Sequence, residues 1–90
     1  MRQDVILSMG DREIRLSFQE QAVLFFRRTP LGMERYARFS LPPEFQDMEF
    51  YDLYMEGGHP LAILVGRSFY DIAVILDEET GQMIRWHLSK

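Results

Sequence analysis

The side chains that could perform acid–base or metal chemistry are few in this chain. There is no cysteine, and the two histidines are His59 and His87, so thiol nucleophiles and thiolate metal sites are excluded. A metal site would need one of these histidines together with carboxylates, and the densest carboxylate cluster is Asp77, Glu78 and Glu79. Because these three are consecutive, they lack the alternating oxygen-ligand spacing of a calcium loop. The sequence predicts no metal site, and we interpret the cluster as the solvated tip of a hairpin.

Each histidine has a simple structural interpretation. His59 lies between Gly58 and Pro60, where a turn residue is the ordinary explanation. His87 is expected diagonally across a sheet from Asp71, and an enzyme could use that pair. However, no nucleophile or oxyanion donor accompanies it, and no phosphate-binding glycine motif occurs in the chain. We therefore expect no catalytic residue and no cofactor.

Charge is unevenly distributed along the sequence. The net charge of −4 disfavours nucleic acid as a partner, because such binding needs an excess of basic side chains to neutralise phosphates. Arginines interleaved with aromatic residues at 25–39 would otherwise suit base stacking. The charged runs fit solvated faces, and the arginines alternatively fit a recognition patch for a protein. The arginines are Arg27, Arg28, Arg35 and Arg38, and the acidic run that follows is Glu44, Asp47, Glu49, Asp52 and Glu56.

The first segment has the pattern of a β-hairpin. Apolar residues alternate with polar ones on both sides of Gly10-Asp11. A two-residue turn there places Leu7 opposite Ile14 and Val5 opposite Leu16, so that both apolar sets share one face.

The next segment has the pattern of a helix. Ser17 and Glu20 have the spacing of a capping box, and an apolar stripe follows them. The sequence predicts a helix over 18–28, which ends at the Pro and Gly of 29–32. Segment 29–41 fits either a helix or a strand.

The second half of the chain predicts an antiparallel meander of four strands. Apolar alternation and glycine-containing gaps indicate strands over 48–55, 60–66, 69–76 and 82–88. In the last hairpin we expect a three-residue loop, Glu79-Thr80-Gly81, with Gly81 at a positive φ. The expected pairs are Leu76 with Ile84, Val74 with Trp86, Ile72 with Leu88, Met55 with Leu61, Leu53 with Ile63 and Tyr51 with Val65, the last three around a Gly57-Gly58-His59 loop.

These pairings put one face of the sheet in the core, including Ile84, Trp86 and Leu88. They leave a mixed face behind it, which includes Ala62 and Leu64. The mixed face is too apolar for bare solvent and too charged for a dry interior. Either the chain's own hairpin, helix or 29–41 segment covers it, or a partner protein does, with apolar anchors and charged residues that set specificity. The candidate partner-binding residues are Phe50, Asp52, Tyr54, Phe69, Asp71, Met83, Arg85 and His87.

The sequence therefore predicts an α+β fold: an antiparallel β-meander sheet with an N-terminal hairpin and one or two short helices packed on it. Ninety residues, 47% of them hydrophobic, suit one domain over 1–90. The longest apolar runs are too short for a signal peptide core or a membrane span. We expect a cytoplasmic protein that does not contact a membrane.

Several motifs of the second half occur together in one known family. They are a Leu-Pro that precedes an aromatic residue, a strand that ends in Val-Gly, and a closing hydrophobic-Asp…Thr-Gly hairpin. In these motifs residues 39–88 resemble the SUKH superfamily. The resemblance implies an α+β domain without catalytic residues that acts by binding, typically as an immunity protein that blocks a bacterial toxin. The matching positions are Leu41, Pro42, Phe45, Val65, Gly66, Ile75, Leu76, Asp77, Thr80 and Gly81.

We expect a non-enzymatic, protein-binding inhibitor of the immunity or phage-encoded type, which neutralises a toxin or nuclease-like target by covering its working surface. An acidic binder suits a basic target, because complementary charge accelerates encounter. The alternative is a small regulatory module that homodimerises through the mixed face of its sheet.

Overall fold

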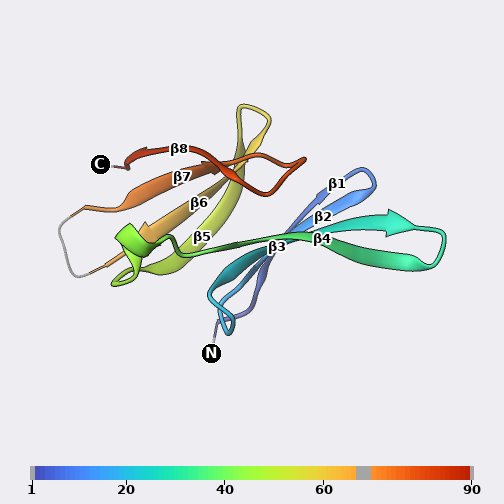
Figure 1. The fold of residues 1–90 in the computed structure, drawn as a ribbon, viewed down its shortest axis with the longest axis horizontal. Helices are drawn as coiled ribbons and strands as arrows, with labels where there is room; N and C mark the ends of the chain where they lie inside the picture. The colour runs from blue at the N-terminus through green and yellow to red at the C-terminus, as the bar shows by residue number, and fades with distance from the viewer. Residues whose placement is uncertain (1, 67–69, 90) are drawn as a thin grey trace.

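A computed structural model describes residues 2–66 and 70–89. These residues form two antiparallel four-stranded sheets, in the strand orders β1-β2-β3-β4 and β5-β6-β7-β8 (Figure 1). The predicted α+β class is wrong, because the described residues contain no α-helix and only one 3-10 turn, η1. No helix in these two ranges could therefore cross a membrane. The elements are β1 (Val5–Met9), β2 (Arg12–Ser17), β3 (Ala22–Thr29), β4 (Gly32–Ser40), η1 (Pro43–Phe45), β5 (Glu49–Glu56), β6 (His59–Val65), β7 (Ile72–Leu76) and β8 (Met83–Leu88).

The first hairpin is confirmed. Val5 lies opposite Leu16 and Leu7 opposite Ile14, around a turn at Gly10 and Asp11. Turn chemistry and apolar alternation specify the same register here, so local sequence was sufficient to predict it.

The segment predicted as a helix, 18–28, is instead the turn after β2 followed by most of β3. The capping contact does form, because Ser17 Oγ accepts a hydrogen bond from the Glu20 N–H at 3.2 Å. It stabilises a tight turn that ends at Gln21, whose φ of +52° reverses the chain. The Gln21 side chain holds the turn in place, since its Oε1 accepts the N–H of Phe50 in the second sheet at 2.8 Å.

The ambiguous segment 29–41 forms a strand. It contributes β4, which pairs with β3 through a two-residue turn between Thr29 and Gly32. The β3–β4 hairpin continues past the end of β2, whose last pair with β3 is Arg12 with Arg27. Its tip therefore projects beyond the body of the fold (Figure 1). The apolar run at the start of β3 is buried on both faces, as expected for a central strand.

The register predicted for the third hairpin is wrong by one residue. Gly57 and Gly58 alone form the turn, with φ values of +60° and +82° that suit a two-residue hairpin loop. A shift of one residue exchanges the two faces of one strand relative to the other, so Leu53 pairs with Ala62 and not with Ile63. A bulge at Tyr51 then returns the preceding residue of β5 to the inner face.

The closing hairpin is mostly confirmed. Val74 pairs with Trp86 and Ile72 with Leu88, and Gly81 has the expected positive φ, +74°. A bulge leaves Ile84 unpaired, so its predicted partner in β7 faces Met83 instead.

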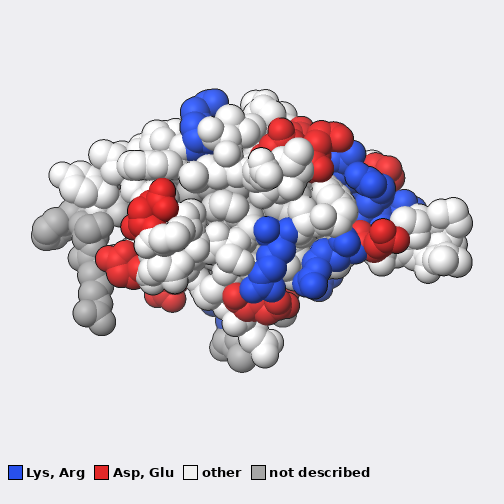
Figure 2. Space-filling model, in the orientation of Figure 1, with Lys and Arg blue, Asp and Glu red and all other residues white. Residues whose placement is uncertain are grey.

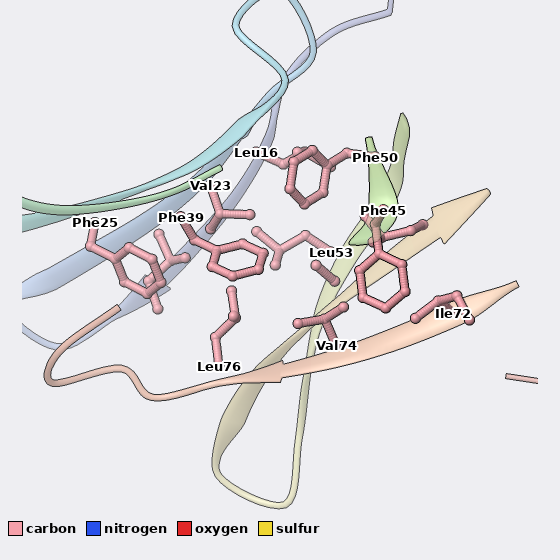
Figure 3. Close-up of a cluster of buried hydrophobic side chains, with 13 residues drawn as sticks. Leu16, Val23, Phe25, Phe39, Phe45, Phe50, Leu53, Ile72, Val74 and Leu76 are labelled. Atoms are coloured by element: carbon pink, nitrogen blue, oxygen red, sulfur yellow. The ribbon is translucent and has the colours of Figure 1, made fainter. Parts of the chain in front are cut away.

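The hydrophobic core lies between the two sheets. In Figure 3 side chains from β2, β3 and β4 point toward side chains from η1, β5 and β7. Residues Ile84, Trp86 and Leu88 were expected in this core, but they are 44–52% exposed. They belong to β8, which pairs only with β7 and forms the outer edge of its sheet. Labelled core members in Figure 3 include Leu16, Val23, Phe25, Phe39, Phe45, Phe50, Leu53, Ile72, Val74 and Leu76.

Candidate functional site

Four of the candidate partner-binding residues share the outer face of the second sheet, the face that points away from the core. Two neighbouring rows of cross-strand partners cross this face. One row has Asp52 at its β5 end and His87 at its β8 end, and the next has Tyr54 and Arg85 at the same two ends. The complete rows are Asp52–Ile63–Ala73–His87 and Tyr54–Leu61–Ile75–Arg85.

The middle and the ends of these rows differ in exposure. The four apolar residues in the middle form a second buried cluster, so the residues at the row ends make the accessible part of the face. Tyr54 is 40% exposed, and Arg85 and His87 are also exposed. Three strand spacings separate the two edges, about 14 Å. The face therefore has an acidic edge at Asp52 and a basic edge at Arg85, with an aromatic ring beside the acid.

Three other candidate residues do not join this face. Phe50 is only 3% exposed and lies in the inter-sheet core. Met83 also packs against that core, because the bulge at Ile84 turns it inward. Asp71 is half-buried just before β7, where its carbonyl accepts the N–H of Ser89 at 2.8 Å. Phe69 lies outside the described residues.

Strand β6 explains why the outer face was predicted correctly for the four candidate residues of β5 and β8 but incorrectly for the residues of β6 between them. Its apolar residues run without interruption from Leu61 to Val65, so the sequence does not specify which set faces the core. Ala62 and Leu64 were assigned to the mixed face, yet they lie in the core, and Leu61 and Ile63 take their places outside. The polar residues of β5 and β8 kept their faces because Asp52, Arg85 and His87 are unfavourable inside.

The carboxylate cluster of the closing hairpin is a contact between the sheets, which corrects its interpretation as a solvated tip. Arg12 of β2 donates from Nη1 to the Glu78 carbonyl at 2.9 Å and forms an ion pair with Glu79 at 2.8 Å. The Tyr36 hydroxyl donates to the same carbonyl, and Glu78 Oε1 lies 3.2 Å from His59 Nδ1. We name these five residues the inter-sheet clasp: Arg12, Tyr36, His59, Glu78 and Glu79.

Local backbone features place both halves of the clasp. A bulge in β4 leaves Tyr36 unpaired and aims its ring toward the core, against Phe25. On the other side, Asp77 Oδ1 accepts the backbone N–H groups of Glu79 and Thr80 at 2.7 and 3.3 Å. Gly81 completes the turn at a position where a Cβ atom would lie 2.6 Å from the Cβ of Ala37.

The Tyr36 hydroxyl acts in the clasp as a hydrogen-bond donor. Burial raises the pKa of Tyr36 above its ordinary value, and the nearby guanidinium of Arg12 offsets only part of this effect. The phenol therefore stays protonated as a donor. Arg12 and Arg27 lie over the ring at 5.5 and 4.7 Å, a cation–π arrangement that adds attraction without a reactive group. The Glu79 carboxylate raises the pKa of Arg12.

Other polar features of the described ranges lie outside the clasp. Residues 2–66 and 70–89 contain no group of three or more histidines or carboxylates placed to hold a metal ion. An open hollow of about 380 Å³ at the end of the second sheet is lined by Asp47 and Glu49 beside Met48 and Val65. It brings two carboxylates beside an apolar floor.

The two halves of the chain carry opposite charge. Residues 1–41, which include the first sheet, have seven arginines and five acidic residues, a net charge of +2. Residues 42–90 have three basic and nine acidic residues, a net charge of −6. In Figure 2 the basic side chains gather mainly over the first sheet, with carboxylates beside them. Two of these arginines are paired on the surface, Arg15 with Glu13 and Arg38 with Glu20.

Comparison with known proteins finds no family model that matches the chain and no significantly similar curated protein or solved structure.

Proposed function

We propose that this protein is a non-enzymatic, protein-binding inhibitor, which uses the outer face of its second sheet to cover the working surface of a basic toxin or nuclease-like protein. The observation that carries the proposal is the grouping of Asp52, Tyr54, Arg85 and His87 at the ends of two adjacent rows on one sheet face.

The chemistry of these residues supports a protein partner. Tyrosine and arginine are the residue types that most often dominate binding energy at protein interfaces. They stand here on a rigid sheet, so little ordering is needed when a partner binds. A net charge of −6 in residues 42–90 favours a basic target, because complementary fields accelerate encounter and disfavour acidic competitors.

The resemblance of residues 39–88 to the SUKH superfamily points to the same class of function. However, the α+β domain that this resemblance implied is not the fold of this chain. The proposal therefore rests on the surface of the second sheet and not on the resemblance.

Site-specific photocrosslinking in the cell tests the proposal. A photoreactive phenylalanine at position 54 should give an adduct with one basic protein. Position 51 is the matched control, since Tyr51 belongs to the same strand and is 52% exposed. Tyr51 stacks with Arg2 at 4.7 Å and lines a hollow beside Phe18, in the turn between β2 and β3, away from the outer face.

The identity of the adduct decides the outcome. The proposal expects an adduct from position 54 that is absent from position 51, and it expects the captured protein to lose its activity when the purified chain is added. Equal adducts from both positions, or a captured protein whose activity is unchanged, would contradict it.

A further inference from the structure

The free edge of β8 differs from an ordinary protected edge strand. Natural sheets guard exposed edges with lysine, proline, inward-pointing charge or a β-bulge. β8 has a bulge at Ile84, but from Arg85 to Leu88 it has no lysine, proline or inward-pointing charge, and its only charged side chain, Arg85, lies on the outer face. Trp86 and Leu88 are 45% and 52% exposed, although both point to the inner side of the sheet opposite Val74 and Ile72.

The hydrogen-bond pattern shows which backbone groups face this edge. Ser89 donates its N–H to the Asp71 carbonyl at 2.8 Å, so 71 with 89 is a hydrogen-bonded pair of the antiparallel ladder. Such pairs alternate along a ladder, which makes Ala73 with His87 hydrogen-bonded and Val74 with Trp86 not. The backbone groups of Trp86 and Leu88 therefore point away from β7, toward the free edge.

Most of these outward groups have no partner in the described part of the chain. The exception is the Leu88 carbonyl, which lies 3.0 Å from Nδ1 of its neighbour His87. A carbonyl has two lone pairs, so this local contact leaves room for a second donor. The Trp86 N–H, the Trp86 carbonyl and the Leu88 N–H are available for another strand.

We propose that a second copy of this chain pairs with this edge, β8 antiparallel to β8, about a two-fold axis that passes beside His87. In this register Trp86 lies opposite Leu88 of the second copy, and the two residues exchange backbone hydrogen bonds through their outward groups. His87 lies opposite its own counterpart as a pair that is not hydrogen-bonded.

Two observations select this register. A two-fold axis perpendicular to the sheet keeps side chains of opposite residues on one face, so the axis must pass beside a residue and not between two. An axis at Trp86 would require Ile84 to pair, and Ile84 is the bulged residue. An axis at His87 uses only the regular run from Arg85 to Ser89.

The proposed dimer extends the sheet and leaves its outer face free. Both copies would present Asp52, Tyr54, Arg85 and His87 on the same side, because the axis is perpendicular to the sheet. The dimer rests on the edge strand and not on the proposed inhibitor function, so either can fail alone. An edge pairing of this length is smaller than the roughly 1,200 Å² of stable interfaces, and we expect a dissociation constant of roughly 10 μM or weaker.

Single-cysteine variants test the register directly, because the natural chain has no cysteine. Opposite residues in pairs without hydrogen bonds have Cα atoms about 4.5 Å apart, within disulfide range. His87→Cys should therefore form a covalent dimer under mild oxidation. Arg85→Cys and Ser89→Cys face each other and not themselves, so each should crosslink at least about fivefold more slowly, as should the edge control Ser8→Cys on β1. Equal crosslinking at 85, 87 and 89, or at 87 and 8, would overturn the register.

Sedimentation over a dilution series tests the dimer without cysteine. The natural chain should change from monomer to dimer as concentration rises. Leu88→Lys should raise the dissociation constant at least about tenfold, while Ile6→Lys, at a position on edge strand β1 that is 49% exposed, should change it less than about twofold. A chain that stays monomeric, or a dimer that tolerates Leu88→Lys, would overturn the proposal; in the first case the edge would be left for a different partner.

Discussion

Substitution of Gly81 by alanine should be among the most destabilising single changes in this chain. Two separate effects add at this position. The φ of +74° places any residue with a Cβ in the left-handed region, which costs roughly 1–2 kcal/mol. The new Cβ would also lie 2.6 Å from the Cβ of Ala37 and 3.2 Å from the Phe25 ring, and such overpacking costs roughly 1–3 kcal/mol. The expected loss in the free energy of unfolding is about 2–5 kcal/mol.

Gly10→Ala is the matched control for this loss. Gly10 has a φ of +62°, and a Cβ there would meet no atom within 4 Å, so only the conformational cost of about 1–2 kcal/mol applies. Urea unfolding followed by circular dichroism measures both variants, and the difference between them isolates the contact with the first sheet. The double variant Gly81→Ala/Ala37→Gly should be more stable than the sum of the two single losses predicts, because it removes the closest atom. Equal losses at the two glycines, with no coupling to Ala37, would refute docking of the closing hairpin on the first sheet.

Three further outcomes follow from the placement of individual side chains. Phe50→Ala should lower the unfolding free energy by about 3–5 kcal/mol, as for a core phenylalanine, and Tyr54→Ala by about 1 kcal/mol or less; similar urea midpoints would contradict the assigned faces. Because burial raises the pKa of Tyr36 in the folded state above the ordinary value of 10.0, its contribution to stability is complete below pH 10 and is lost as pH rises through the folded pKa. An ultraviolet titration should therefore show an ionisation above pH 10 that is missing in Tyr36→Phe; a titration curve that this substitution leaves unchanged above pH 10 would contradict this. Association with the captured partner should slow as salt concentration increases, since net charge steers the encounter. An association rate constant that does not change with ionic strength would exclude a basic target.

The sequence predicted the hairpins best where two local signals agreed. At Gly10-Asp11 the turn residues and the alternation specify one register, and the structure has it. At Ser17 and Glu20 the capping pattern is real, but it closes a turn, because the run after it packs as a central strand. The helix prediction failed because tertiary burial of β3 outweighed a local pattern.

The errors in the second sheet come from features that the alternation of apolar and polar residues along a strand does not reveal. Bulges at Tyr51 and Ile84 each add one residue to a strand, and nothing in a simple alternation indicates where a bulge occurs. The orientation of β6 was undetermined because its apolar run suits both faces. The polar residues Asp52 and Arg85 were nevertheless placed on the outer face, since burial of an unpaired charge is unfavourable on any register. The contact of Glu78 with Tyr36 joins residues 42 positions apart, and no short-range pattern predicts it.

The affinity for the partner captured from position 54 is the most direct test of the proposed binding surface. Titration calorimetry would compare the natural chain, Tyr54→Ala and Tyr51→Ala, two tyrosines of β5 with similar exposure, 40% and 52%. Loss of an interface tyrosine at the centre of binding costs about 1.4 kcal/mol or more, a tenfold change. We predict that Tyr54→Ala raises the dissociation constant at least about tenfold and that Tyr51→Ala changes it less than about twofold. Equal affinity for all three chains, each shown to be folded, would contradict the assignment of the outer face as the partner-binding surface.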